Sequence, residues 1–316
     1  MAVRARGFDR SNPITLLTSG ALVVVSAFSA VGLLKHQAPD VVVGFGGYVS
    51  LPLGLAAYVS RTPLVLHEQN SVPGLANRIL SRWARSVGVT YENSVRHLRR
   101  SDRVTLTGNP VRPAVLAADG DRGRQRLGLR ADATVLLVFG GSRGARHLNE
   151  RMIELAQRLV ADPALEIVHV AGRIEAESVR EHIASVPGAQ DAYHVFEYID
   201  DMGDAIAAAD LVIARAGATS IAEITAIGRA SILVPYPYAT DDHQTLNART
   251  LAQARAAEVV ADADIDSEEF YRSIVRLTGD RPRRDAMAGA ASALARRDAT
   301  ERLVQLVLSS AGKDPR

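Results

Sequence analysis

The chain has no cysteine among its 316 residues. This absence excludes disulfide bonds, thiolate zinc sites and cysteine nucleophiles, and it is compatible with a reducing compartment. The chain also lacks the G-x-G-x-x-G dinucleotide fingerprint, the Walker A motif and a Ser-His-Asp order. Hydrophobic residues make up 47% of the sequence and charged residues 23%, which is typical of a globular protein. The length is sufficient for two domains.

Charge is distributed unevenly along the sequence, although the net charge is only +2. Residues 1–112 contain 13 Lys and Arg against 5 Asp and Glu, and the remainder contains 24 against 30. A basic first half predicts an anionic partner, either a nucleic acid or an acidic membrane surface. Because no nucleic-acid motif is present, a membrane or a phosphorylated ligand is favoured over nucleic acid.

A run of 21 uncharged residues, 14–34, precedes Lys35. Its length alone is enough for a membrane span, which needs about 20 apolar residues. However, threonine, serine and glycine residues interrupt the run, and a strand-loop-helix series follows it directly. We therefore expect a helix that is buried or touches a membrane surface rather than one that crosses it. A secretory signal is disfavoured, because no cleavage-site pattern follows the run.

Short apolar runs alternate with helical patterns from Asp40 onward. This alternation predicts an α/β fold of the doubly wound type, with parallel sheets and helices on both faces. The expected strands are residues 41–44, 64–67, 87–90 and 104–107 in the first half, and 135–139, 167–170, 194–196, 211–214, 232–234 and 258–260 in the second.

A stretch rich in proline, glycine and charge, residues 108–132, is typical of a linker between domains. We place the boundary at Arg112, so that residues 1–112 and 113–297 form two Rossmann-like domains with ligands in the cleft between them. We expect the first domain to be incomplete. A doubly wound domain opens with a strand that becomes central in its sheet, whereas this chain opens with irregular basic residues and the apolar run.

The segment VLLVFGGSRGARHLNE, residues 135–150, combines a strand, paired glycines and the start of a helix. Such a turn presents backbone N–H groups and a helix N-terminus, an arrangement by which proteins hold phosphates. Since it matches neither nucleotide-binding fingerprint, the segment alone indicates an anion site without identifying the ligand.

Two polar stretches end strands of the first half. In LHEQNSVPG, residues 66–74, polar side chains crowd the point where an α/β protein keeps its ligand-facing groups; the alternative is a turn in which Asn70 and Ser71 cap the next helix. In TGNPVR, residues 107–112, Arg112 is either a phosphate clamp or a linker arginine bound only by water.

Two more stretches lie in the second half. In RAGATSIAEITAIG, residues 215–228, Ser220 and Glu223 fit the S-x-x-E capping box, in which Glu223 satisfies a backbone N–H; the alternative is that Glu223 accepts hydrogen bonds from a ribose. In PYPYATDDHQTLNA, residues 235–248, a loop facing a sugar or nucleotide is favoured over a metal site, because adjacent side chains seldom converge on one ion.

Several stretches occur together in the order found in one family: VVVGFGGYVSLPLGLAA, PLVLHEQNSVPGLANR, TGNPVR, VFGGSRGARHLN, YIDDM, RAGATSIAEITAIG and DDHQTLNA. From about residue 7 onward, the sequence closely resembles the MurG family, bacterial N-acetylglucosaminyltransferases of peptidoglycan synthesis. The resemblance implies the GT-B fold, with two Rossmann-like domains and a C-terminal helix, within residues 298–316, that packs back on the first.

The resemblance implies an inverting transfer of N-acetylglucosamine from UDP-N-acetylglucosamine (UDP-GlcNAc) to the C4 hydroxyl of undecaprenyl-pyrophosphoryl-MurNAc-pentapeptide, the step from lipid I to lipid II. Such a reaction needs a general base and electrostatic stabilisation of the departing UDP. A helix N-terminus after Gly140 and Gly141 can supply the second, so neither a metal nor a cofactor is expected. A role in cell-wall growth, cell shape and cell division would follow.

Site residues follow from the resemblance position by position. For the UDP-sugar it implies Ser142 in the glycine loop, Ile199 beside the uracil and Gln244 on the sugar. Asn70 and Arg112 would face the donor from the first domain, and Glu223 would bond the ribose hydroxyls. The residues implied along the phosphates and ribose are Ala218, Thr219, Ser220, Ile221, Ala222 and Glu223.

For the acceptor, the resemblance implies a loop that receives the diphosphate, with Gly44, Gly46, Gly47, Tyr48 and Ser50 as its candidate residues. A lipid-linked acceptor also implies a peripheral position on the cytoplasmic side of the cell membrane, where an apolar patch rimmed by basic residues meets anionic lipid. Other cell-wall synthesis proteins are expected as further partners. The candidate basic residues are Arg4, Arg6, Arg10, Lys35, Arg78, Arg82 and Arg85.

The sequence departs from the family pattern within residues 1–40. Members of the family begin with a strand and a loop of the form G-G-T-G-G-H, whose histidine is a favoured catalytic base and whose glycines help to bind the acceptor diphosphate. Residues 1–40 contain no such pattern. We therefore leave the catalytic residues unassigned, and we expect the family's activity of a full-length product but not of these 316 residues.

Two other functions fit parts of the sequence. A UDP-sugar epimerase of the same fold would need its own catalytic carboxylates, and it would release epimer or free sugar without an acceptor. A non-catalytic nucleotide-binding fragment would bind the UDP-sugar without transferring it.

Overall fold

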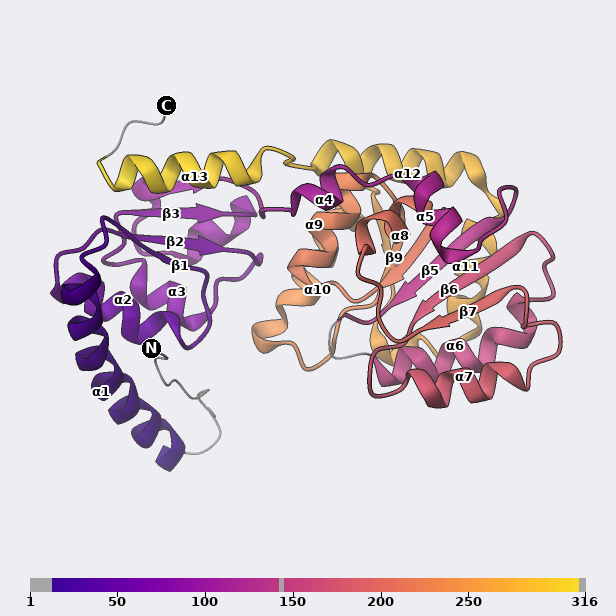
Figure 1. The fold of residues 1–316 in the computed structure, drawn as a ribbon, viewed down its shortest axis with the longest axis horizontal. Helices are drawn as coiled ribbons and strands as arrows, with labels where there is room; N and C mark the ends of the chain where they lie inside the picture. Colours follow the sequence, from indigo (N-terminus) through magenta and orange to yellow (C-terminus); the bar gives the residue numbers. More distant parts are fainter. Residues whose placement is uncertain (1–12, 142–144, 313–316) are drawn as a thin grey trace. The chain divides into compact units, whose positions relative to one another are not determined.

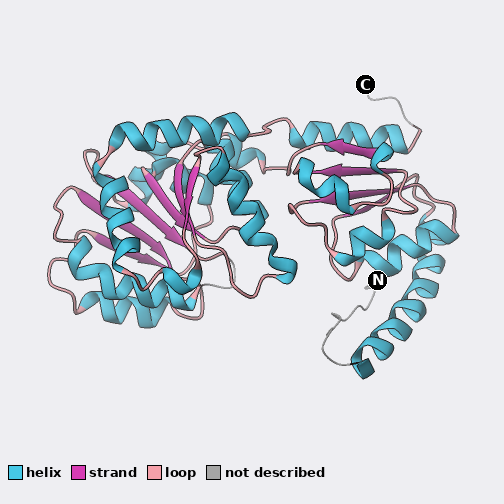
Figure 2. Cartoon of the chain, turned by 180° about the vertical axis from the view of Figure 1, so that it is seen from behind, coloured by secondary structure: helices cyan, strands magenta, loops and turns pink. Residues whose placement is uncertain are grey.

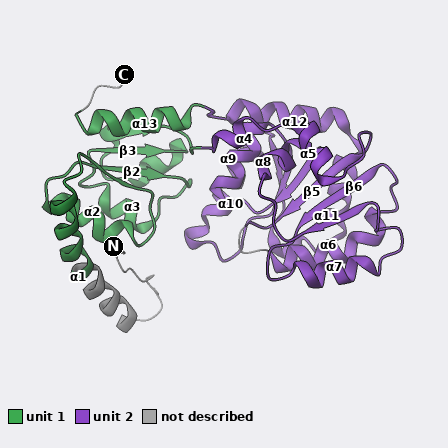
Figure 3. Cartoon of the chain, viewed as in Figure 1, with its two compact units in different colours: residues 1–110, 298–316 green, residues 111–297 purple. Residues whose placement is uncertain are grey.

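The structure, a computed structural model, describes residues 13–141 and 145–312, with the backbone alone for residues 13–24. The chain divides into two compact units (Figure 1, Figure 3). Unit 1 contains the described residues up to Pro110 together with those from Asp298 onward, and unit 2 runs from Val111 to Arg297. The division falls in the proline-rich stretch beside Arg112, where the sequence changes in charge.

Unit 1 contains a parallel four-stranded sheet whose strand order follows the chain, β1-β2-β3-β4. β2 is buried along its whole length, as is typical of an inner parallel strand covered on both faces. The strands are β1 (Val42–Gly44), β2 (Leu64–Glu68), β3 (Ser86–Val89) and β4 (Val104–Leu106).

Helices from both ends of the chain pack in unit 1. α1 and α2 pack together, and α13 packs against β2 and β3, where the hydroxyl of Ser310 donates to that of Ser86 at 3.0 Å. α2 and α3 approach closely at Gly54, where a Cβ atom would lie 2.6 Å from Leu80. The helical segments are α1 (Pro13–Gln37), α2 (Ser50–Val59), α3 (Leu75–Leu80), η1 (Glu92–His97), η2 (Ser101–Arg103) and α13 (Ala299–Ser310).

α1 covers the uncharged run of residues 14–34, so the helix expected there is present. In its described second half, Ser26, Ala30 and Leu34 are buried at intervals of four residues, whereas Val25 and Phe28 are 63% and 75% exposed. The helix therefore has one packed side and one apolar exposed side. Within the described part of the chain, no helix is long and apolar enough to span a bilayer.

Unit 2 contains a parallel six-stranded sheet in the order β10-β9-β8-β5-β6-β7. The chain builds β5, β6 and β7 in one direction and then returns to place β8 on the other side of β5. This reversal is the mark of a doubly wound sheet. The strands are β5 (Thr134–Phe139), β6 (Leu165–Val170), β7 (Tyr193–Phe196), β8 (Leu211–Ala214), β9 (Ala230–Leu233) and β10 (Ala257–Val259).

Helices cover both faces of this sheet (Figure 2). Successive side chains of a strand point to opposite faces, so Leu136 and Val138 of β5 join one apolar core while Leu137 and Phe139 join the other. The helical segments are α4 (Pro113–Leu116), α5 (Gly120–Leu127), α6 (Arg146–Leu159), α7 (Ala176–Ala184), α8 (Met202–Ala208), α9 (Ala218–Ile227), η3 (Thr240–Asp242), α10 (His243–Gln253), η4 (Asp262–Asp264), α11 (Glu268–Gly279) and α12 (Arg281–Leu294).

The ten strands expected from the sequence are all present, and the predicted α/β architecture with parallel sheets is confirmed.

Candidate functional site

The reversal of strand order in unit 2 brings two strand-to-helix connections together. β5 and β8 are neighbours, and their last paired residues are Phe139 and Ala214. The connection after β5 leads to α6, and the connection after β8 leads to α9, so both helices begin at the carboxyl edge of the sheet. Open α/β sheets bind their ligands at such a reversal. Ser142, the residue expected to touch the diphosphate, lies outside the described residues.

The first turn of α9 presents backbone and hydroxyl groups at this edge. Gly217 is the N-cap and has no side chain for capping. Thr219 is exposed and Ser220 is half-buried, so the turn is accessible to an anion. The side chain of Ile221 is only 4% exposed and belongs to the core, and its backbone N–H donates to the carbonyl oxygen of Gly217 at 3.0 Å. Ala222 is half-buried behind it.

Glu223 projects from α9 toward the chain that enters unit 2. Its side chain is 10% exposed, and Oε1 lies 3.4 Å from Nη2 of Arg112. Burial raises the pKa of Glu223, and the Arg112 guanidinium opposes that rise. The capping-box alternative is wrong, because α9 begins at Ala218 and Ser220 is therefore already inside the helix. The alternative that Arg112 is a linker arginine bound only by water is also wrong, because its guanidinium contacts Glu223. A carboxylate held in this way is suited to accept hydroxyl hydrogen bonds.

Gln244 lies at the start of α10, after β9. Its Oε1 accepts a hydrogen bond from the backbone N–H of Tyr236 at 2.9 Å, which orients the side-chain amide. Just before it, Asp241 and Asp242 adopt φ angles of 53° and 51°, in the left-handed region that non-glycine residues rarely enter. Backbone strain of this kind is concentrated at ligand sites.

Ile199 follows β7 at the other end of the same edge. It is half-buried and packs against the core, and the neighbouring Tyr198 is 56% exposed with the Arg173 guanidinium 5.7 Å from its ring centroid. β7 and β9 are four strands apart, about 19 Å at about 4.8 Å per strand. The predicted residues of unit 2 thus extend along the edge in a row that fits an elongated ligand.

The loop after β1 in unit 1 contains the residues expected at the acceptor. Gly46 and Gly47 have φ angles of 80° and 73°, which favour glycine. A Cβ atom at Gly44 would lie 3.0 Å from Leu66, and the hydroxyl of Ser50 donates to the carbonyl oxygen of Gly46 at 2.5 Å. Tyr48 is 38% exposed. The loop is thus a tight turn whose backbone an anion can approach closely.

Asn70 is held by Glu68, the last residue of β2. Glu68 is 3% exposed, and its carboxylate accepts hydrogen bonds from the backbone and side-chain nitrogens of Asn70 at 3.0 and 3.3 Å. It also accepts from the backbone N–H of Gly74 at 3.1 Å and from the Asn77 amide at 2.8 Å. The alternative that Asn70 and Ser71 cap the next helix is wrong, because Gly74 is the N-cap of α3.

His67, beside Glu68, is fully buried. Its Nε2 lies 2.9 Å from the carbonyl oxygen of Gly108, and since a carbonyl only accepts, Nε2 carries the proton and Nδ1 has the lone pair. Burial lowers the pKa of His67 despite that hydrogen bond and the nearby Glu68 carboxylate. The imidazole is therefore neutral near pH 7.

Sequence profiles of glycosyltransferase family 28 match both units: the C-terminal domain at residues 135–303 and the N-terminal domain at residues 4–89. The chain belongs to this family. Among its relatives, the UDP-N-acetylglucosamine–N-acetylmuramyl-(pentapeptide) pyrophosphoryl-undecaprenol N-acetylglucosamine transferase of Desulforamulus reducens is 40% identical over 281 residues, which are 88% of this chain and 76% of that protein.

Solved structures support the same relationship. A crystal structure of Acinetobacter baumannii MurG has a TM-score of 0.74 and 33% identity, covering 92% of this chain and 80% of its own. The expected GT-B fold is confirmed. A structure of UDP-GlcNAc 2-epimerase from Neisseria meningitidis, bound to UDP-GlcNAc, has a TM-score of 0.66 but 15% identity, covering 96% and 83%. At 15% identity, the likeness to the epimerase shows a shared fold and nothing more.

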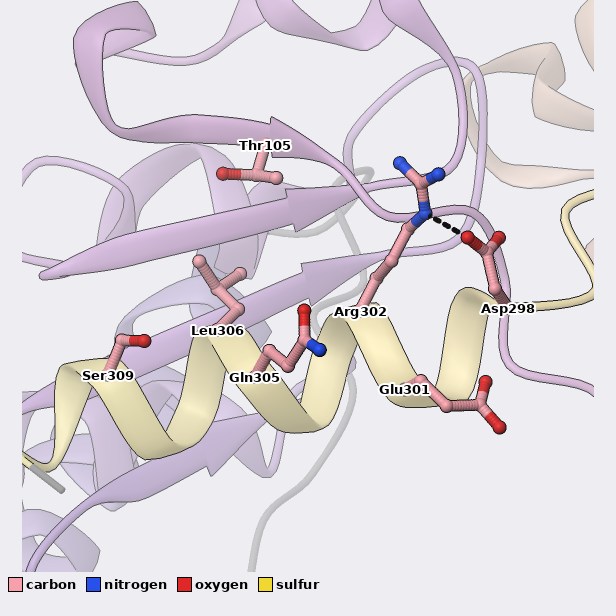
Figure 4. A pocket seen from close by; sticks show the side chains of 7 residues that line it. All are labelled: Thr105, Asp298, Glu301, Arg302, Gln305, Leu306 and Ser309. Carbon is pink, nitrogen blue, oxygen red and sulfur yellow. Dashed lines mark hydrogen bonds and ion pairs between the residues drawn. The ribbon is translucent and has the colours of Figure 1, made fainter. Parts of the chain in front are cut away.

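A polar groove lies elsewhere in unit 1, between β4 and α13 (Figure 4). Its lining residues are Thr105, Asp298, Glu301, Arg302, Gln305, Leu306 and Ser309. Nε of Arg302 lies 2.6 Å from Oδ2 of Asp298, which closes one end with an ion pair. None of the expected site residues lines this groove.

The sequence alone assigned no role to Glu68, Asn77 or Arg215. Each becomes visible only through its contacts: Glu68 and Asn77 hold the segment around Asn70, and Arg215 is 7% exposed at the end of β8. One sequence signal could have pointed to Glu68 and Arg215. Each is a charged residue at the end of a buried apolar strand, Glu68 as the last residue of β2 and Arg215 directly after β8. Within the described residues, no group of three histidines or carboxylates is arranged to hold a metal ion.

Proposed function

We propose that this chain serves the reaction named for its relatives, the transfer of N-acetylglucosamine from UDP-GlcNAc to lipid I, which yields lipid II, even though residues 1–40 do not contain the family's G-G-T-G-G-H pattern. The observation that carries the proposal is the site at the strand reversal of unit 2. There the N-terminus of α9 and the nearly buried Glu223 offer an anion site and a diol acceptor side by side, as a nucleotide sugar requires.

Each part of the donor has a counterpart along this edge. The N-termini of α6 and α9 face the diphosphate, with Ser142 assigned there by the family pattern. Glu223 accepts from the ribose hydroxyls, Gln244 donates to the sugar, and Ile199 lies against the uracil. Arg112, whose side chain is 59% exposed, pairs with Glu223 and adds a positive charge near the phosphates.

The chemistry follows from these placements. The muramyl C4 hydroxyl attacks the anomeric carbon of N-acetylglucosamine, the bond from that carbon to the diphosphate oxygen breaks, and the hydroxyl proton passes to a general base. UDP leaves with the electron pair of the broken bond. The positive ends of two helices and Arg112 stabilise this developing charge without reorganisation. We assign no side chain to the base.

The acceptor diphosphate is placed at the loop of residues 44–50, whose paired glycines leave the backbone open. Asn70 follows the next strand of the same sheet and is held in place by Glu68, and the family resemblance assigns it to the donor. His67 is buried and neutral, so it contributes shape and a fixed hydrogen bond to this region rather than charge.

The lipid part of the acceptor places the chain at a membrane surface. α1 and the end of α2 both expose apolar side chains: Val25, Phe28, Tyr58 and Val59 are each exposed by 55% or more. Tyr58 lies 5.2 Å from the ring of Trp83. Four of the candidate basic residues have exposed side chains in unit 1: Lys35, Arg78, Arg82 and Arg85. Arg4, Arg6 and Arg10 lie outside the described residues. Apolar contact combined with positive charge favours an anionic leaflet.

Two measurements test the proposed function. Calorimetric titration with UDP-GlcNAc should show binding that Glu223→Gln weakens by about tenfold, since a hydrogen bond to a charged group contributes about 1.5 kcal/mol. The matched control is Glu177→Gln on the exposed surface of α7. Ser142→Ala should weaken binding by about threefold through loss of one hydroxyl contact. Absence of UDP-GlcNAc binding would overturn the proposal.

The second measurement is transfer of labelled N-acetylglucosamine to a lipid-linked muramyl acceptor. Product that forms only when the acceptor is present supports the transferase. Epimer or free sugar released without an acceptor would support the epimerase instead, and binding without either product would support a non-catalytic nucleotide-binding role.

A further inference from the structure

Four neighbouring strands of unit 2 contribute to one charged cluster at the carboxyl edge of the sheet, where their order is β10-β9-β8-β5. Arg215 directly follows β8, Asp262 begins η4 after β10, and His147 is the second residue of α6 after β5. The cluster therefore joins the start of α6 to the ends of the other strands.

Arg215 is the inner member of the cluster, with 7% of its surface exposed. Its Nη1 lies 2.5 Å from Oδ1 of Asp262 and donates to the carbonyl oxygens of Val234 and Pro235, each at 3.3 Å. Its guanidinium lies 5.7 Å from the ring centroid of Tyr236. One buried cation thus ties the end of β9 to η4 and holds one oxygen of Asp262.

His147 holds the other oxygen. Its Nδ1 lies 2.9 Å from Oδ2 of Asp262, and its Nε2 lies 3.1 Å from both carboxylate oxygens of Asp266. Because an ionised carboxylate only accepts, both ring nitrogens donate only when the imidazole is protonated. The neutral ring has a single N–H and must give up one of the two contacts.

Both members of this pair are shifted toward their charged forms. The hydrogen bond to Asp262 raises the pKa of His147 against an opposing effect of burial, and Asp266 adds to the rise. Burial is the largest effect on Asp262 and would raise its pKa, but the hydrogen bonds from His147 and Arg215 bring that pKa below its ordinary value.

Three arginines of α6, the helix that carries His147, have partners of their own. These pairs are Arg146 with Glu175, Arg151 with Glu154, and Arg158 with Glu268. Arg215 faces His147 across Asp262. Protonation of His147 is therefore governed by Asp262 and Asp266.

We propose that His147, acting through Asp262 and Arg215, positions the start of α6 for the diphosphate of the UDP-sugar, so that donor affinity depends on the protonation of His147. The proposal rests on the proposed donor site. The imidazolium fixes the first turn of α6 to η4 and adds a positive charge at that helix N-terminus. When the proton is lost, one of the two hydrogen bonds of His147 and its positive charge are lost together.

The direction of the pH effect follows from the contacts. Because folding raises the pKa of His147, the tie is complete below about pH 6.5, the ordinary value for an unfolded histidine, and is lost as the pH rises through the folded value. Both phosphates of UDP-GlcNAc are esterified and stay ionised over this range. A change in affinity therefore belongs to the protein, whereas UDP itself has a phosphate that titrates there.

The test is calorimetric titration of the full chain with UDP-GlcNAc between pH 6.0 and 8.5. Wild type should bind about threefold more weakly at the upper end, the size expected for a partly exposed ion pair. His147→Gln should bind at every pH as wild type does at pH 8.5. Repeating the titration in buffers of different ionisation enthalpy should show proton uptake on binding by wild type and none by the variant.

His182→Gln is the control, because His182 is exposed on α7 and contacts only its own helix, at the carbonyl oxygen of Ser178. This variant should keep the wild-type pH dependence. Asp262→Asn removes the carboxylate that links both cations, and it should weaken binding by about tenfold at every pH. Circular dichroism shows whether that variant folds; if it does not, His147→Gln, whose side chain is 34% exposed in wild type, decides the question.

Different results would reject the proposed function and the positioning role of His147. If wild type does not bind UDP-GlcNAc, the proposed function fails. If wild type binds with an affinity that is constant over this pH range, or if His147→Gln shows the wild-type pH dependence, the positioning role of His147 is wrong while the donor site stands.

Discussion

Unit 1 and unit 2 are both parallel α/β units, yet their sheets are ordered differently. In unit 1 the strands follow the chain from β1 to β4, whereas in unit 2 the order reverses between β5 and β8. The reversal brings two helix N-termini to one point of the sheet edge, and the predicted donor residues of unit 2 lie there and along the edge to either side. In unit 1 the predicted residues lie instead at the ends of the neighbouring strands β1 and β2.

The two units also balance their buried carboxylates differently. In unit 2 each is paired with an arginine: Asp204 with Arg122, Glu166 with Arg130, Glu223 with Arg112, and Asp262 with Arg215. In unit 1, Glu68 is surrounded by amide and backbone donors, and no lysine or arginine of the described residues pairs with it. Unit 2 thus balances these carboxylates with cations, whereas unit 1 balances Glu68 with neutral hydrogen-bond donors.

The largest effect should come from removing the carboxylate of unit 1. Glu68→Ala leaves buried donors of Asn70, Gly74 and Asn77 without their acceptor, and it should lower the free energy of unfolding by about 3 kcal/mol. Denaturant unfolding measures this loss. Glu92→Ala, at an exposed position in η1, is the control and should have almost no effect. A loss below about 1 kcal/mol would mean that water replaces the carboxylate.

A second comparison uses one close-packed glycine from each unit. A Cβ atom at Gly123 of α5 would lie 2.2 Å from the backbone carbonyl oxygen of Asp204, whereas at Gly54 the obstacle is the end of the Leu80 side chain. Gly123→Ala should cost about 2 kcal/mol, because the backbone of α8 must move. Gly54→Ala should cost less, about 1 kcal/mol, because a side chain, even the buried one of Leu80, shifts more readily than backbone, and alanine favours a helix. Equal thermal shifts in the two variants would contradict this difference.

A third prediction concerns acid. The hydrogen bond from Arg122 holds the pKa of Asp204 below its ordinary value against burial, so this group stabilises the fold above about pH 4, and the contribution is lost as the pH falls through the lower folded value. At pH 7, Asp204→Asn should cost about 1.5 kcal/mol. The gap between wild type and variant, measured by thermal unfolding, should shrink toward pH 3. A gap that does not change with pH would show that shape, not charge, is what Asp204 contributes.

The smallest effect is expected at the basic surface of unit 1. Arg82→Ala should weaken binding to vesicles containing anionic lipid by about fivefold, since each surface cation contributes about 1 kcal/mol. Added salt should reduce the difference, and vesicles of neutral lipid should show none. Arg281→Ala, at an exposed position in unit 2, serves as the control. Indifference of wild type to lipid charge and salt would remove the membrane from the proposed function.

The fold could be predicted from local pattern to a large extent. The apolar run VLLVF, followed by paired glycines, predicted the buried strand β5, and the glycines after β5 and β8 mark the turns into helices. The candidate site was harder. The S-x-x-E pattern at Ser220 and Glu223 favours a capping box, but α9 begins two residues earlier, because Gly217 can start the helix without a side-chain cap. Helix boundaries depend on such small energy differences, which tertiary contacts readily override.

The sequence by itself determined the ten strands, the helices between them and the family, because apolar periodicity and glycine turns act over short distances along the chain. Tertiary structure alone decided what each polar group meets: Arg112 for Glu223, 111 residues away, and Asp262 for His147, 115 residues away. Such partners depend on strand order and on the register of the sheet. Buried charges must be paired or hydrogen-bonded wherever the fold brings them, so their partners are a property of the packed sheet rather than of any local pattern.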